Sequence, residues 1–101
     1  MKFFNTAKGE KETFHSDKKN IGLYICGPTV YSDTHLGHAK SYVSFDVLKR
    51  WLIYKGYEVT HIQNFTDVSD ETALGASKEG VDEFTFTQKY EKEFLEKMSL
   101  L

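Results

Sequence analysis

The sequence contains a single cysteine, Cys26, and a single proline, Pro28, among its 101 residues. One cysteine excludes a disulfide within the chain and is typical of a reducing compartment, so we expect a cytoplasmic protein. No hydrophobic run approaches the roughly 18 residues that a membrane-spanning helix needs. The first residues also lack the apolar core of a signal peptide. These absences predict a soluble protein with no membrane partner.

The sequence also lacks a large excess of charge of either sign. It has 13 Lys and Arg residues and 15 Asp and Glu residues, which leaves a net charge of −2. This balance gives no general attraction to phosphate backbones, so a nucleic-acid partner would need a local patch or another part of the protein. The chain has neither a GxGxxG fingerprint nor a P-loop lysine motif, which disfavours a dinucleotide dehydrogenase and a P-loop NTPase. With 40% hydrophobic residues the chain can nevertheless bury a core.

Strand-like and helix-like segments alternate along the chain. Residues 2–5 and 10–15 predict a β-hairpin, and residues 21–26 predict a mostly buried strand that ends at Gly27-Pro28. A helix is expected over about 35–54, followed by a second strand over 57–64. Strand, helix and strand in this order predict an α/β fold with a right-handed βαβ unit and a parallel strand pair.

The ends and faces of the helices follow from individual residues. Asp33 or Thr34 is expected to cap the helix over 35–54, because either side chain can accept from the free N–H groups of the first turn. The apolar side chains of that helix form a wide face that is expected to pack on the sheet, with its aromatic rings in the core. These side chains are Tyr42, Val43, Phe45, Val47, Leu48, Trp51, Leu52 and Tyr54.

Two further helices are expected near the end of the chain. Residues 70–79 predict the first, weakened by Gly75 and closed by Gly80. Thr85 or Thr87 is expected to cap the second, whose apolar residues recur every three or four positions. This pattern continues to Leu101 without a stop signal, so we interpret the chain as a truncated one. The recurring residues are Tyr90, Phe94, Met98 and Leu101.

The stretch from Tyr24 to His38 joins the first strand of the βαβ unit to its helix. A strand that stops at a glycine-containing turn and leads into a helix N-terminus presents backbone N–H groups to an anion. His35 and His38 lie on one face of the first helical turn, and Gly37 between them would let a ligand approach the backbone. The two imidazoles would stabilise charge on a phosphoryl group, or they are ordinary surface histidines beside a helix cap.

Cys26 follows the same strand, at the edge of the sheet where α/β folds bind their ligands. It is a candidate metal ligand or, alternatively, a small buried apolar residue. Neither His15 nor His61 has a ligand-like spacing to Cys26, so this chain does not complete a four-ligand zinc site. The polar residues after the second strand would hold an ammonium group or a ribose hydroxyl, or serve as turn and cap residues. These residues are Thr66, Asp67 and Asp70.

These motifs closely resemble those of cysteinyl-tRNA synthetases, which are class I aminoacyl-tRNA synthetases. The resemblance covers nearly the whole chain and depends most on LYICGPTVY at 23–31 and HLGH at 35–38, in the place of the class I HIGH signature. It continues through FDV at 45–47, GYEV at 56–59 and NFTD at 64–67. The resemblance implies a Rossmann-like, HUP-type nucleotide-binding fold. Residues 1–101 would form the amino-terminal part of the catalytic domain, with a short hairpin before the first half of the parallel sheet.

The resemblance also implies roles for individual residues. Cys26 matches the first of four zinc ligands, and a soft thiolate on zinc would separate substrate cysteine from serine better than a pocket contact. His35 and His38 match the histidines that hold the ATP phosphates during formation of the adenylate. The remaining residues of the implied ATP site are Pro28, Thr29 and Gly37. The residues of the implied amino-acid site are Cys26, Gly27 and Thr66.

The activity implied by the resemblance is that of a cysteine–tRNA ligase. ATP, as its Mg²⁺ complex, would activate cysteine to cysteinyl-adenylate, and tRNA(Cys) would bind through regions outside this chain. The other zinc ligands and the KMSKS loop would also lie outside it, so we expect the isolated chain to be inactive. It is further expected to self-associate through its incomplete sheet. The alternatives are a related ligase that transfers cysteine to an amino sugar, or a non-catalytic paralogue that binds a nucleotide or a protein partner.

Overall fold

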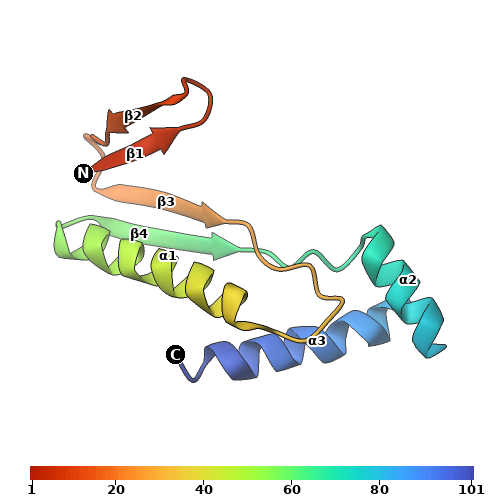
Figure 1. Ribbon diagram of the computed structural model, residues 1–101. Helices are drawn as coiled ribbons and strands as arrows, with labels where there is room; N and C mark the ends of the chain where they lie inside the picture. Colours follow the sequence, from red (N-terminus) through yellow and green to blue (C-terminus); the bar gives the residue numbers. More distant parts are fainter.

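The computed structural model describes all 101 residues, which form four strands and three helices (Figure 1). In chain order these are β1 (Lys2–Asn5), β2 (Glu10–Thr13), β3 (Asn20–Ile25), α1 (Leu36–Tyr54), β4 (Glu58–Gln63), α2 (Asp70–Glu79) and α3 (Glu83–Met98). β1 pairs with β2 as an antiparallel hairpin, and β3 pairs with β4 in parallel. The predicted α/β class, the hairpin and the parallel pair around a helix are therefore confirmed.

The β3–β4 sheet has one covered face and one open face. Tyr24 and its register partner Ile62 point to the open face and are 64% and 58% exposed. The alternate residues of both strands are half-buried or buried on the other face, where His61 and Gln63 share a cavity lining with α1. Figure 1 shows α1 running along the two strands on that side. This alternation is the period of two that a sheet covered on one face requires.

The apolar face expected for α1 is much less buried than predicted. Leu52 is the one buried residue of the helix, whereas Phe45, Val47 and Tyr54 are exposed. Trp51 and Tyr54 stack on each other at the surface, with ring centroids 5.5 Å apart. A two-stranded sheet is too narrow to cover both flanks of a 19-residue helix. The interpretation of the aromatic rings as core residues is therefore wrong for Phe45, Trp51 and Tyr54, whereas Tyr42 is half-buried.

The predicted caps of α1 and α3 are also wrong. His35, not Asp33 or Thr34, is the N-cap of α1. Asp82 caps α3 in place of the expected Thr85 or Thr87, because its carboxylate accepts from the backbone N–H of Thr85 at 2.9 Å. The prediction that Gly80 ends α2 is confirmed, since this glycine adopts φ 69° at the C-cap.

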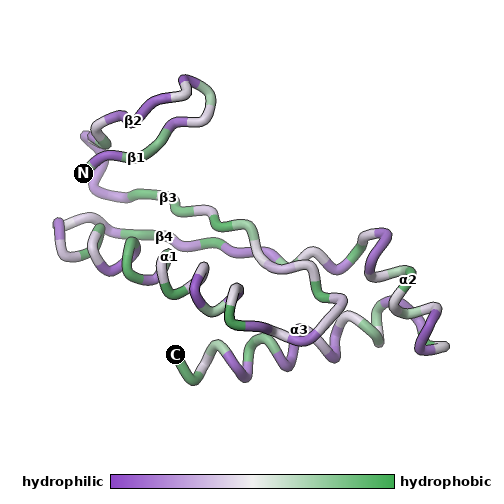
Figure 2. The backbone as a smooth tube through the Cα atoms, in the orientation of Figure 1, coloured by the Kyte–Doolittle hydropathy of each residue, from purple (hydrophilic) through white to green (hydrophobic).

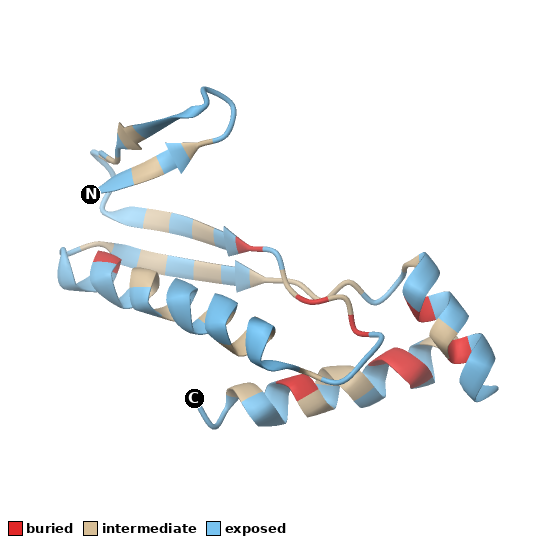
Figure 3. Cartoon of the chain, viewed as in Figure 1, coloured by how far each residue is buried: buried red, intermediate tan, exposed pale blue.

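The core has two parts, which Figure 3 shows at the loop after β3 and along α2 and α3. One part lies between α2 and α3, where Ala76 and Phe86 are buried. The other centres on Phe94 of α3, whose ring makes edge-to-face contacts with Tyr42 and Phe65 at centroid distances of 5.4 Å each. The C-terminal end of the chain is hydrophobic (Figure 2), and its last two residues, Leu100 and Leu101, are exposed. No helix of the chain is long and apolar enough to cross a membrane.

Candidate functional site

The two loops that leave β3 and β4 run side by side beyond the ends of the strands. Thr29 pairs with Thr66 in a parallel bridge. The backbone N–H of Val30 donates to the carbonyl of Thr66 at 3.1 Å, and the N–H of Thr66 donates to the carbonyl of Pro28 at 3.0 Å. The structure therefore brings Pro28, Thr29 and Thr66, three of the predicted site residues, to one edge of the sheet.

Asn64 ties the end of β4 to the turn after β3. Its side-chain Oδ1 accepts from the backbone N–H of Gly27 and from the Tyr24 hydroxyl, both at 2.9 Å. A Cβ on Gly27 would lie 1.5 Å from the carbonyl oxygen of Asn64, so the chains approach each other as only a glycine allows. Our sequence-based reasoning assigned no role to Asn64. The available indication was an amide side chain, which both donates and accepts, placed directly after a strand.

Cys26 carries an exposed thiol at the carboxyl end of β3, so the interpretation as a buried apolar residue is wrong. The carbonyl oxygen of Cys26 accepts from the hydroxyl of Tyr42 at 3.3 Å. Burial raises the pKa of Tyr42, and the nearby Cys26 thiol adds to that rise. Because Tyr42 lies one turn after His38 on α1, it connects the strand end that carries the thiol to the helix that carries the histidines.

His35 and His38 form a reciprocal cap at the start of α1. The Nδ1 of His35 accepts from the N–H of Gly37 at 3.1 Å, and the Nδ1 of His38 accepts from the N–H of His35 at 3.3 Å. The two rings stack with centroids 3.9 Å apart and an interplanar angle of 17°. A Cβ on Gly37 would lie 3.0 Å from the His35 ring, so a larger residue there would crowd the ring that caps the helix.

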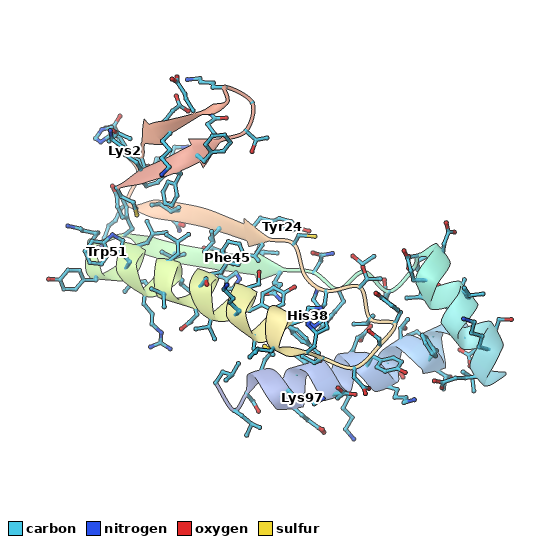
Figure 4. All side chains as sticks on the ribbon, viewed as in Figure 1. Lys2, Tyr24, His38, Phe45, Trp51 and Lys97 are labelled. Carbon is cyan, nitrogen blue, oxygen red and sulfur yellow. The ribbon has the colours of Figure 1, made fainter.

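His38 is the more enclosed of the two histidines, and Figure 4 shows it at the start of α1 near α3. Its ring lies 6.5 Å from that of Phe94. Burial lowers the pKa of His38, and the neighbouring positive charge that His35 can carry lowers it further. His38 and Tyr42 thus share Phe94 as a neighbour, and Tyr42 contacts Cys26. This chain of contacts links the start of α1, which carries the imidazole pair, to the backbone at the end of β3, where Cys26 lies.

Cys26 is the candidate metal ligand of this chain. No group of three or more His, Cys, Asp and Glu side chains lies close enough to hold a metal ion. His15 instead pairs with Asp17 at 2.8 Å, and the Nε2 of His61 is buried without a hydrogen-bond partner. The exposed thiol of Cys26 is a suitable single zinc ligand, but tetrahedral zinc would need further ligands from outside these 101 residues.

A cavity of about 520 Å³ lies behind this edge, between α1, β4 and α3. Tyr42, Asn64 and Phe94 contribute to its wall, as does the ring of His61. Neither Cys26 nor His35 lines it. The cavity therefore adjoins the candidate site through shared wall residues but is separate from the thiol and the imidazole pair.

Glu93 of α3 anchors the loop that precedes the histidines. Its carboxylate accepts from Lys97 at 2.6 Å and from the backbone N–H of Thr34 at 3.0 Å. Lys97 first, and the Thr34 N–H second, lower the pKa of Glu93 below its ordinary value. Sequence-based reasoning missed this residue, because the partner that defines its role lies 59 positions away.

Glu93 should make the stability of the chain depend on pH. Its folded-state pKa is lowered, so its contribution is complete above the unfolded-state pKa of about 4.3 and is lost as the pH falls through the folded-state pKa. We expect the melting temperature of the native chain to fall more steeply with pH below about 4.3 than that of Glu93→Gln. Thermal unfolding followed by circular dichroism across this pH range measures the two melting temperatures. If the melting temperatures of the native chain and of Glu93→Gln fell in parallel with pH, the expectation would be contradicted.

A comparison with protein families shows the class of protein to which the chain belongs. Residues 12–101 match the family model of the catalytic domain of class I (C) tRNA synthetases. The chain therefore belongs to the class I tRNA synthetase catalytic-domain family. Individual relatives narrow the comparison to proteins named cysteine–tRNA ligase.

Three such relatives come from distant sources. The chain is 46% identical over 99 residues to the cysteine–tRNA ligase of Chlamydia pneumoniae, covering 98% of this chain and 21% of that protein. It is 42% identical over 102 residues to that of Thermococcus kodakarensis, covering 100% of this chain and 21% of that protein. The chloroplastic/mitochondrial cysteine–tRNA ligase of Zea mays is 40% identical over 103 residues, covering 100% of this chain and 18% of that protein. The chain thus spans about a fifth of the length of these relatives.

Proposed function

We propose that residues 1–101 form the amino-terminal part of the catalytic domain of a cysteine–tRNA ligase, with a Rossmann-like, HUP-type fold. The observation that supports this proposal is the hydrogen bond from the Tyr42 hydroxyl to the backbone carbonyl of Cys26, which ties the end of β3 to the helix that the histidines cap. The reaction would activate cysteine with ATP and Mg²⁺ and transfer it to tRNA(Cys). The names of the relatives support this choice of amino acid and acceptor.

In this mechanism the imidazoles of His35 and His38 bind phosphate oxygens of ATP beside the positive end of the α1 dipole. A carboxylate oxygen of cysteine attacks the α-phosphorus, and the bond to the β,γ-pyrophosphate breaks as the pyrophosphate leaves with the bonding electrons. Pro28, Thr29 and Gly37 would line the nucleotide side of this edge. Gly27 and Thr66 would line the amino-acid side.

Cys26 would contribute a thiolate ligand to zinc. When bound, zinc would supply a soft Lewis acid for the thiol of the substrate, which serine lacks. The part of this selectivity that belongs to the present chain is the position of Cys26. That position is fixed by the Tyr42 hydroxyl on its carbonyl and by Asn64 on the next residue.

A chimera tests the proposal. Residues 1–101 would replace the matching first fifth of the Chlamydia pneumoniae enzyme, and cysteine-dependent exchange of pyrophosphate into ATP would be measured. We expect exchange with cysteine and at least 100-fold less with serine, as expected for recognition through a thiolate on zinc. Because the isolated chain supplies a single zinc ligand, we expect it to show no adenylate formation in a single-turnover assay.

Two experiments separate the alternatives. The acceptor is decided by the coding sequence after residue 101, because tRNA(Cys) would bind through regions outside this chain: an anticodon-binding domain there supports the tRNA ligase, and its absence favours the related thiol-biosynthesis ligase. A chimera that melts cooperatively and binds tRNA(Cys) but shows no exchange would overturn the catalytic assignment in favour of a non-catalytic paralogue. The Chlamydia pneumoniae enzyme itself serves as the positive control. Self-association of the isolated chain through its open sheet face, where Tyr24 and Ile62 are exposed, stays a prediction.

A further inference from the structure

The cap of α1 is made by ring nitrogens, which imposes a chemical condition that a carboxylate or hydroxyl cap does not. An imidazole nitrogen accepts a hydrogen bond only when it carries no proton. Nδ1 of His35 faces the N–H of Gly37, and Nδ1 of His38 faces the N–H of His35. A backbone amide always donates. Both Nδ1 atoms must therefore be unprotonated for the cap to form.

We propose that the backbone N–H groups of His35 and Gly37 act as positioning groups that fix both histidines in the tautomer with the proton on Nε2. Each neutral ring then has one donor, and that donor is the nitrogen not engaged with the helix. Because the rings stack with centroids 3.9 Å apart, the two Nε2–H donors belong to adjacent rings. The site thus presents a pair of hydrogen-bond donors before any ligand arrives.

This inference extends the proposed function by explaining which ligand chemistry the pair accepts. Phosphate oxygens are acceptors, so they match two Nε2–H donors, whereas the opposite tautomer would present lone pairs and repel them. Burial against Phe94 and the neighbouring ring both disfavour a charged His38, which keeps its Nδ1 free to accept. Gly37 has a part in this arrangement because a Cβ would press on the His35 ring at 3.0 Å.

The tautomer can be read directly by long-range ¹⁵N–¹H NMR of the isolated chain, which reports the protonation of each ring nitrogen. The chain has four histidines, and single substitutions assign their signals. Above the titration of the rings, we expect His35 and His38 to show an unprotonated Nδ1 and a protonated Nε2. A protonated Nδ1 on either ring in the folded chain would overturn the proposal.

Two variants of His35 distinguish the capping role of Nδ1 from the donor role of Nε2. His35→Asn places an amide oxygen near the position of Nδ1, so it should keep the cap and lose the Nε2 donor. His35→Gln reaches the position of Nε2 but removes the capping acceptor. We expect the Gly37 amide to exchange with solvent at the native rate in His35→Asn and about tenfold faster in His35→Gln, as for one lost hydrogen bond. Equal exchange rates in the two variants would contradict the capping role.

The affinity of the native chain and of His35→Asn for ATP tests the functional part of the proposal. If the proposed function is right, His35→Asn should weaken ATP binding by about tenfold despite its intact cap, as for one lost donor to a charged phosphate. An unchanged affinity in His35→Asn, or no binding of ATP by the native chain, would count against the phosphate-binding role. That outcome would leave the tautomer result standing, because the NMR measurement requires no ligand. The two failures are therefore distinguishable.

Discussion

Replacing Phe94 by alanine is expected to lower the free energy of unfolding by about 3–5 kcal/mol, the usual cost of removing a buried phenylalanine ring. Phe94 is 5% exposed and contacts the rings of Tyr42 and Phe65. Few other residues of the chain are buried, so little else compensates for the loss. Urea unfolding followed by far-ultraviolet circular dichroism measures the change.

Phe84 supplies the matched control for this experiment. It is a phenylalanine of the same helix but is 67% exposed, so Phe84→Ala should change stability by no more than about 0.5 kcal/mol. Phe94→Ala should also alter the NMR signals of the His38 ring, which lies 6.5 Å from Phe94. Equal destabilisation by the two substitutions would show that α3 does not pack under the histidines as described.

The regular parts of the fold were predictable because they follow from local patterns. The alternation of residues along β4 is visible in the sequence, whereas the prediction of a mostly buried strand over 21–26 is wrong, because one face of β3 is open and Tyr24 is 64% exposed. The end of α2 at Gly80 follows from the freedom of glycine to adopt positive φ. The order of strand, helix and strand then limited the topology to a parallel pair.

The buried face of α1 was not predictable from the same kind of pattern. Hydrophobic periodicity says which residues would be buried if a partner covered them, but it does not say how wide the partner is. In this chain the partner is a sheet of two strands, and Trp51 and Tyr54 therefore stack in solvent. The caps failed for a related reason, because propensity favours Asp and Thr while the reciprocal hydrogen bonds favour His35.

The motif residues of the candidate site could be predicted from the sequence, but the residues that hydrogen-bond to them could not. The CGPTVY and HLGH segments gave Cys26, His35 and His38 as candidates, and a hydrogen bond from Tyr42 links the backbone of Cys26 to the helix that His35 caps. The residues that fix their geometry come from distant positions: Tyr42 on α1 bonds to Cys26, and Asn64 after β4 bonds to Gly27. No local pattern links these partners, because their contacts exist only once the βαβ unit has folded.

Replacing Gly27 by alanine is expected to cost at least about 3 kcal/mol of stability, the upper end of the usual penalty for overpacking. The new Cβ would lie 1.5 Å from the carbonyl oxygen of Asn64 and 2.7 Å from its carbonyl carbon, and real Cβ contacts essentially never fall below 3.0 Å. Both obstructing atoms are backbone, so no side chain can move aside to relieve the clash. The turn after β3 must separate from the end of β4.

Gly22 is the control, since it lies in β3, the strand before this turn, and an added Cβ there would meet nothing within 4 Å. Gly22→Ala should be neutral or slightly stabilising, because alanine has less backbone freedom to lose on folding. In the chimera, Gly27→Ala should also reduce cysteine-dependent exchange at least tenfold, because the separation breaks the Asn64 bond that orients the residue after Cys26. If both alanine variants unfolded at the same urea concentration, the close approach of the two strand ends would be wrong.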